Sequence, residues 1–163
     1  FKNCKRVSSG MSEMSDYLKN EINEAVANLT KDIAALSHET LSKCWGESSR
    51  CAYDYLYEVG IVNHRVACRV KGEEPGPMPW KFGEEWLKAP SEFQSKEKVT
   101  EFLTSTGAAI AEGIGEDPTR KVKVGENEQS VYSLVSFAAM HTMYHDAQLN
   151  FIQEMQGDMA VHW

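Results

Sequence analysis

Apolar residues recur every three or four positions in four stretches of the chain, and this spacing predicts four long helices. The stretches cover residues 11–36, 49–70, 95–114 and 131–156. In the first, Lys, Glu and Asp fill the gaps between the apolar positions, which is typical of an amphipathic helix with one buried face. The second is apolar on nearly all sides, so we expect it to be the most enclosed of the four.

Two longer connections separate these helices. Residues 72–92 contain three glycines and three prolines before Trp86, which precludes a regular element there. Connections of about 20 residues are usually functional or held by packing, and we expect Trp80, Phe82 and Trp86 to hold this one. Residues 121–124 (KVKV) read as one short extended piece, which cannot make a sheet alone.

Four long helices and two connections predict an all-α protein, a four-helix bundle with a long loop between helices two and three. The 163 residues suffice for one domain with a real core and not for two, and we assign residues 11–163 to it. Residues 1–10 (FKNCKRVSSG) are basic and contain serine but no acid. We expect them to be a flexible segment, or a remnant of a transit peptide or of an expression vector.

The composition argues against several kinds of partner. Acidic residues outnumber basic ones 24 to 17, and no basic stripe interleaved with aromatics is present, so we expect no binding of nucleic acid. No apolar run approaches the roughly 20 residues that span a bilayer, so we expect no membrane span. The four cysteines lack CxxC spacing and read as reduced thiols. We expect an intracellular protein of the cytoplasm or, if a targeting segment has been removed, of an organelle.

The fourth predicted helix carries two histidines, His141 and His145, four residues apart. At about 100° per residue they lie only about 40° apart around the helix axis, on the stripe that faces the core. Two neutral imidazoles at this spacing can reach one metal ion. They can equally be two packing histidines whose ring nitrogens are bonded inside the core, and spacing alone leaves both interpretations open.

A metal site needs at least a third ligand, and the second predicted helix offers Glu58 and His64. By helical rotation Glu58 lies about 100° from the centre of the main apolar stripe and His64 about 140°. The geometry therefore favours Glu58 only modestly. A carboxylate in an otherwise apolar run is also unusual, although it can simply be a buried acid bonded to a tyrosine or to the backbone.

The segment HTMYHDAQLNFIQ, residues 141–153, resembles the last-helix motif His-x-x-x-His-x-x-Gln of the DinB/YfiT-like superfamily. The resemblance extends over most of the chain. DIAALSHETLSKCW (32–45) resembles the end of the family's first helix, and SSRCAYDYLYEVGIVN (48–63) resembles its second. It implies a four-helix bundle, often a homodimer, that holds a divalent nickel, zinc or iron ion with three histidines, one from helix two and two from the last helix.

On this chain the resemblance implies that His141 and His145 are metal ligands. Gln148 matches the glutamine of the motif. It lies one turn beyond His145, where it can orient a bound water or a ligand imidazole, although a polar side chain bonded across the bundle explains it equally well. Glu58 stands where the family's first histidine is expected, and His64 follows six residues later as the second choice. The departure at Glu58 implies either a working site of two histidines and one carboxylate, or a degenerate site that binds metal weakly.

Two imidazoles and one carboxylate leave open coordination positions for water or substrate, which suits zinc or iron(II). The resemblance implies thiol-dependent chemistry, since relatives include transferases and isomerases that use low-molecular-weight thiols. We therefore expect a metal-dependent thiol transferase or hydrolase with a small-molecule substrate, and we assign no catalytic residue. The alternatives are a non-catalytic bundle that binds a metal or ligand, and a purely structural bundle. Tyr144 and Asp146, beside His145, read as packing and surface residues.

Overall fold

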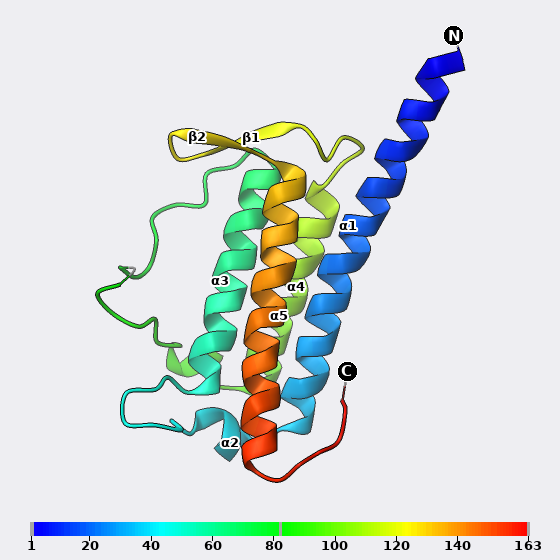
Figure 1. Ribbon diagram of the computed structural model, residues 1–163. Coiled ribbons are helices and arrows are strands. Elements are labelled where there is room, and N and C mark those ends of the chain that lie inside the picture. Colours follow the sequence, from blue (N-terminus) through cyan, green and yellow to red (C-terminus); the bar gives the residue numbers. More distant parts are fainter. Residues whose placement is uncertain (1, 82, 163) are drawn as a thin grey trace.

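The computed structural model describes residues 2–81 and 83–162, with side chains from residue 10 onward. In this part of the chain, four long helices lie side by side (Figure 1). They are α1 (Lys2–Ala35), α3 (Ala52–Val70), α4 (Lys96–Gly113) and α5 (Val131–Met155). The short elements between them are α2 (His38–Ser42), the 3₁₀ helix η1 (Ser91–Phe93) and the strands β1 (Lys121–Val124) and β2 (Asn127–Ser130). The prediction of a mostly helical protein is confirmed.

The helix ends agree with the cap residues in the sequence at two of the four long helices. Ser95 caps α4 by accepting a hydrogen bond from the backbone N–H of Lys98, and Ser130 caps α5 by accepting one from Ser133. Helix α3 begins at Ala52 rather than at Ser49, because Cys51 still has an extended backbone. Helix α1 begins at Lys2, well before the predicted start at residue 11.

The hairpin of β1 and β2 corrects the expectation that residues 121–124 have no strand partner. The two strands pair antiparallel, with Lys121 opposite Ser130 and Val124 opposite Asn127. Gly125 has a positive φ of 61° in the two-residue turn, a conformation that favours glycine. The second strand reads NEQS and is almost entirely exposed, so its sequence carries no apolar alternation by which it could have been predicted.

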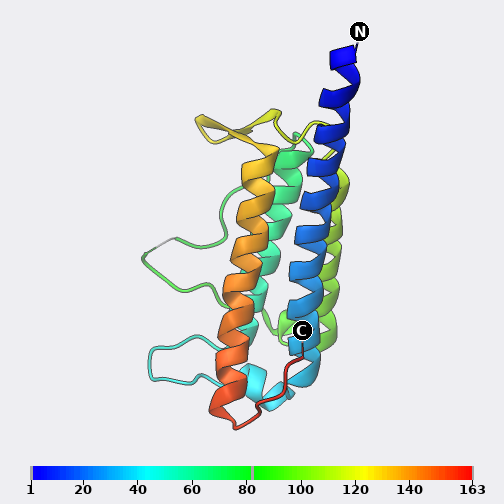
Figure 2. The same cartoon turned by 45° about the vertical axis from the view of Figure 1, so that its right-hand side comes forward.

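Each long helix packs against two of the others. Helix α3 contacts α4 and α5, and α1 contacts the same two helices from the other side (Figure 2). Buried Leu, Ile, Val and Ala side chains from all four helices fill the space between them. At Gly60 the contact between α3 and α4 is so close that an added Cβ would lie 2.3 Å from the ring of Phe102. The arrangement brings α3 and α5 together, and these two helices carry the predicted ligands.

Hydrogen bonds from α3 hold the connection between α3 and α4. Arg65 donates to the carbonyls of Pro75, Gly76 and Pro77, and the buried carboxylate of Asp54 accepts from the backbone N–H of Ala89 and from the Lys88 ammonium. The loop is thus anchored mainly through polar groups. Of the aromatic residues expected to hold it, Trp80 is buried and Trp86 lies over Arg50, while Phe82 lies outside the described residues.

None of the described helices is long and apolar enough to cross a membrane.

Candidate metal centre

One carboxylate and two imidazoles meet where α3 faces α5. The Oε1 atom of Glu58 lies 3.6 Å from Nε2 of His141 and 3.7 Å from Nε2 of His145. One potential ligand atom from each of the three residues lies within 4.8 Å of the others. They form the one such group of three or more His, Cys, Asp or Glu residues in the described part of the chain. The three residues singled out from the sequence are therefore neighbours in space.

The two histidines point into the bundle from adjacent turns of α5. Their side chains are 15% and 2% exposed for His141 and His145, and their rings meet edge-on with centroids 4.7 Å apart. This placement follows from their four-residue spacing on a helix whose neighbouring positions Ala138 and Leu149 are also buried. The inward orientation expected from the helical pattern is thus what the structure has.

Contacts on three sides fix the ring of His145. Its Nδ1 lies 2.7 Å from Oε1 of Gln148, and because an amide oxygen only accepts hydrogen bonds, Nδ1 carries the proton. In the neutral ring this leaves the lone pair on Nε2, the atom that faces Glu58. Tyr55 stacks on one face of the ring at 5.8 Å, and Tyr144 packs edge-on at 5.0 Å. Gln148 thus orients the imidazole of His145.

The two oxygens of Glu58 have different partners. Oε1 faces the histidines, whereas Oε2 accepts a hydrogen bond from the guanidinium of Arg50 in a close ion pair. Burial by itself raises the pKa of the Glu58 carboxyl, but its contacts with His141, His145 and Arg50 outweigh burial and hold the pKa well below its usual range. Glu58 is therefore ionised at neutral pH, the state in which a carboxylate binds a metal.

The chemistry of this group fits a divalent cation. In the neutral form of His145 an ionised carboxylate oxygen faces the lone pair of Nε2, at a distance longer than a hydrogen bond. Two electron-rich atoms in that arrangement need a positive charge between them, either a proton or a metal ion. Tetrahedral zinc with bonds of about 2.0–2.2 Å holds its ligand atoms about 3.3–3.6 Å apart, close to the separations of Glu58 from the two histidines.

His141 is less firmly held than His145. Its Nδ1 is buried and has no hydrogen-bond partner among the described residues, and the ring of Phe137 lies 5.8 Å away. A buried ring nitrogen without a partner costs free energy. The other ring nitrogen, Nε2, faces Oε1 of Glu58.

His64, the alternative third ligand, lies elsewhere. It is exposed on α3, and its Nε2 is 3.7 Å from Sγ of Cys68 rather than near the other histidines. Arg50 and Tyr55, by contrast, contact the site and were not expected from the sequence. Arg50 precedes α3 in a loop, and Tyr55 is one of several aromatic residues in an apolar helix, so neither carried a signal that set it apart.

Asp146 corrects the expectation of a surface residue. Its carboxyl faces that of Asp32 on α1, and Asp32 is only 1% exposed. The Oδ1 atoms of Asp32 and Asp146 have no hydrogen-bond partner among the described residues. Burial, followed by the hydrogen bond with Asp32 and its negative charge, raises the pKa of Asp146 to about 7. Asn150 donates hydrogen bonds to Oδ2 of Asp32 and to the backbone carbonyl of Asp146. Asp146 thus belongs to the α1–α5 contact.

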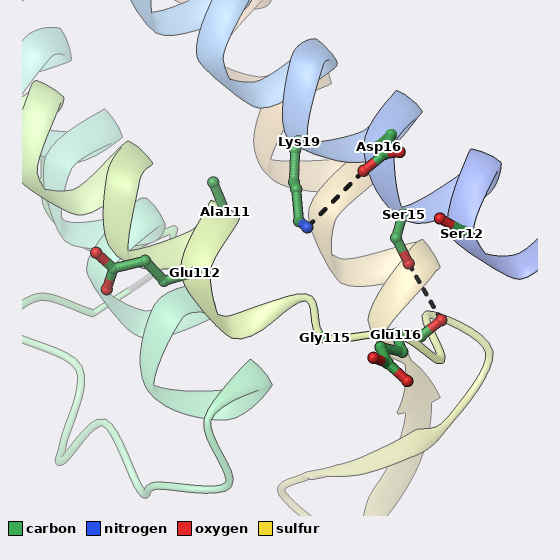
Figure 3. A pocket seen from close by; sticks show the side chains of 8 residues that line it. All are labelled: Ser12, Ser15, Asp16, Lys19, Ala111, Glu112, Gly115 and Glu116. Atoms are coloured by element: carbon green, nitrogen blue, oxygen red, sulfur yellow. Dashed lines mark hydrogen bonds and ion pairs between the residues drawn. The ribbon is translucent and has the colours of Figure 1, made fainter.

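A hollow of about 480 Å³ lies between α1 and α4 (Figure 3), and none of Glu58, His141 and His145 lines it. At its edge Lys19 pairs with Asp16 at 3.9 Å, and Ser15 donates to the backbone carbonyl of Glu116. The side chains of Lys19 and Asp16 are 41% and 68% exposed and pair within one helix, which is ordinary for a surface. We therefore place the candidate function at Glu58, His141 and His145.

Fold and site together define a mostly helical protein with a candidate metal centre between two of its helices. Among solved structures, a DinB-like protein from Bacillus cereus ATCC 10987 is similar, with a TM-score of 0.56 over 82% of this chain and 86% of that chain. The two sequences are 12% identical, so the likeness shows a DinB-like fold and nothing about activity. No protein-family model matches the sequence, and no curated protein is significantly similar to it.

Proposed function

We propose that the chain is a DinB-type four-helix bundle that binds one divalent metal ion through Glu58, His141 and His145. The observation that carries the proposal is that one carboxylate oxygen and two ring nitrogens from neighbouring helices lie within 4.8 Å of one another. The DinB-like fold of the similar structure supports it. Zinc, nickel and iron all accept nitrogen and oxygen ligands of this kind, and the ligand set does not select among them.

We further propose that the protein is a metal-dependent enzyme, a thiol transferase or a hydrolase that acts on a small molecule. Three protein ligands leave coordination positions open, and a divalent ion there supplies a Lewis acid for a thiol, water or substrate oxygen. The rings of Phe137 and Tyr144 lie beside the histidines and are 44% and 61% exposed. They offer an apolar border to an incoming substrate, while Gln148 holds the imidazole of His145 in place.

The alternative function is a bundle that binds a metal or a ligand without catalysis. The ion pair between Glu58 and Arg50 favours it, because one carboxylate oxygen is already engaged by a cation. The two functions are distinguished by adding a panel of thiols and electrophiles to the metal-loaded protein and measuring turnover. Turnover above that of the metal-free protein supports the enzyme, and stoichiometric metal without any turnover supports the binding protein.

The metal proposal is tested by metal analysis of the purified, reconstituted protein and three variants. We expect one equivalent of metal in the wild type and in His64→Ala, and loss of metal in His141→Ala and Glu58→Ala. The variant His64→Ala is a matched control, because His64 is an exposed histidine on the same helix as Glu58. A wild type without metal contradicts the proposal, and loss of metal in His64→Ala but not in Glu58→Ala identifies a different third ligand.

We also propose a homodimer formed through α5. Met140, Met143 and Phe151 are each 61% exposed on this helix, and monomeric proteins rarely expose large apolar patches. Met143 and Phe151 also line a cavity of about 700 Å³ between α1 and α5. Light scattering on the eluting protein should give about twice the 18.3 kDa chain mass for the wild type, and the monomer mass for Phe151→Glu. A monomeric wild type contradicts this proposal.

A further inference from the structure

Arg50 is enclosed at the edge of the candidate metal centre. Its guanidinium carbon lies 4.7 Å from the ring centroid of Tyr55 and 4.7 Å from that of Trp86, so it contacts an aromatic ring from α3 and one from the long loop. The hydroxyl of Tyr55 also donates to the backbone carbonyl of Arg50 at 3.1 Å. The Arg50 side chain is only 10% exposed, although it comes from a loop. Such cation–π contacts fix the plane of a guanidinium.

The contacts form a closed ring around the carboxylate. Arg50 binds Oε2 of Glu58, Oε1 of Glu58 faces His145, the ring of His145 stacks on Tyr55, and Tyr55 packs on Arg50. Every member therefore restrains its neighbours. Trp86 adds the loop to this ring through its contact with Arg50.

The partner of Oε2 decides how Glu58 can act as a ligand. A free carboxylate can bind a metal with one oxygen or with both, whereas a carboxylate whose second oxygen is held by a guanidinium presents only the first. The pairing also cancels the charge of the carboxylate. Glu58 and Arg50 together therefore have no net charge and offer one donor atom, as a neutral imidazole does.

We infer that Arg50 is a positioning residue that makes Glu58 a one-oxygen ligand equivalent to a third neutral imidazole. The inference rests on the proposed metal site. Arg50 does not touch the metal position; it acts through Glu58, by holding Oε2 and thereby directing Oε1 toward His141 and His145. A carboxylate at this position thus completes the ligand set rather than weakening it, because its charge and its second oxygen are both engaged.

The test compares the zinc affinity of the wild type with that of Arg50→Gln and Arg50→Lys, measured by competition with a chromophoric chelator. Removal of a residue that orients a metal ligand typically costs 10–100-fold in affinity, and we expect a loss of about that size in Arg50→Gln. Lysine keeps the charge but lacks the planar guanidinium, so the zinc affinity of Arg50→Lys should lie between those of the wild type and Arg50→Gln. Visible absorption of the cobalt-loaded proteins reports the donor set, and should change in Arg50→Gln.

Arg65→Gln is the matched control, because Arg65 also fixes the long loop but makes its hydrogen bonds to loop carbonyls instead of to Glu58. Its zinc affinity should equal that of the wild type. Trp86→Leu tests the inference without altering either charge, since Trp86 is 64% exposed and its removal should leave the fold intact. We expect this variant to bind zinc about two- to fivefold more weakly through the looser Arg50.

The outcomes separate the two proposals. Zinc binding by the wild type with equal or tighter binding by Arg50→Gln overturns the role of Arg50 and leaves the metal site standing. If Arg50→Gln does not fold, wild-type affinity in both Arg50→Lys and Trp86→Leu overturns that role. A wild type that binds no zinc overturns the metal site and, with it, the role of Arg50.

Discussion

Glu58 on α3 and Asp146 on α5 carry two carboxyl groups in one helical bundle, and their surroundings shift the pKa values of these groups in opposite directions. Glu58 faces two imidazoles and a guanidinium, and its pKa is lowered. Asp146 faces the carboxyl of Asp32, and its pKa is raised to about 7. Burial raises the pKa of both groups, so the difference arises from the neighbouring side chains.

The contrast separates a site that can hold a metal from a site that holds a proton. Around Glu58 the partners keep the carboxylate ionised, and a ring nitrogen from each of two histidines lies within 4.8 Å of it. Around Asp146 the like charge of Asp32 favours a proton shared between two acids, and Asn150 donates to the pair. An acidic residue between helices therefore indicates a metal site only when the side chains that face it are themselves suitable ligands.

The largest effect should come from neutralising each carboxyl in turn. Glu58→Gln should lower zinc affinity by at least about 100-fold, because it removes the one anionic ligand. Asp146→Asn, the same change at the other carboxyl and next to His145, should leave the zinc affinity within about threefold of the wild type, measured by the same chelator competition. Equal losses of zinc affinity in the two variants would contradict the different roles assigned to Glu58 and Asp146.

The next effect concerns stability and pH. The ordinary pKa of an aspartate is 3.8, and that of Asp146 is raised to about 7. Between these values the folded protein keeps a proton that the unfolded chain has released, so the free energy of unfolding falls as pH rises from 4 to 7 and is lowest above it. Urea unfolding at pH 5 and pH 8 should show this fall in the wild type.

In Asp146→Asn the free energy of unfolding should not fall between pH 5 and pH 8. At pH 8 this variant should be more stable than the wild type by about 1–2 kcal/mol, since the amide is uncharged and can donate to Asp32. The two proteins should be nearly equal at pH 5. The same pH dependence in both would show that Asp32 and Asp146 do not share a proton.

A smaller effect is expected at Gln148. Gln148→Leu removes the hydrogen bond to Nδ1 of His145 while keeping a side chain of similar size. Zinc affinity should fall about tenfold, with little change in the urea midpoint of the metal-free protein. Unchanged affinity would mean that Tyr55 and Tyr144 hold the ring without the amide.

The smallest effect is expected at Asn150, which donates to the acidic pair only. Asn150→Ala should lower the free energy of unfolding by about 1 kcal/mol and leave zinc affinity unchanged. A loss of zinc affinity in this variant would mean that the two carboxyl sites are coupled.

Periodicity along the chain sufficed to predict the long helices and the inward direction of both histidines. Glu58 could be singled out because a carboxylate in an apolar run is unusual, and the resemblance of residues 48–63 to the family's second helix placed it where a ligand is expected. Arg50 could not be predicted, because its role depends on the path of a loop that carries no periodic signal. Asp146 was misjudged for a related reason: its partner, Asp32, lies on α1, far away in sequence.

The most direct test of the metal site is a crystal structure of the zinc-soaked protein with data collected at the zinc absorption edge. We expect one anomalous peak about 2.0–2.2 Å from Oε1 of Glu58 and from Nε2 of both His141 and His145, with Arg50 still on Oε2. A peak between Asp32 and Asp146 instead, or no peak at the histidines, would contradict the metal site proposed for this protein.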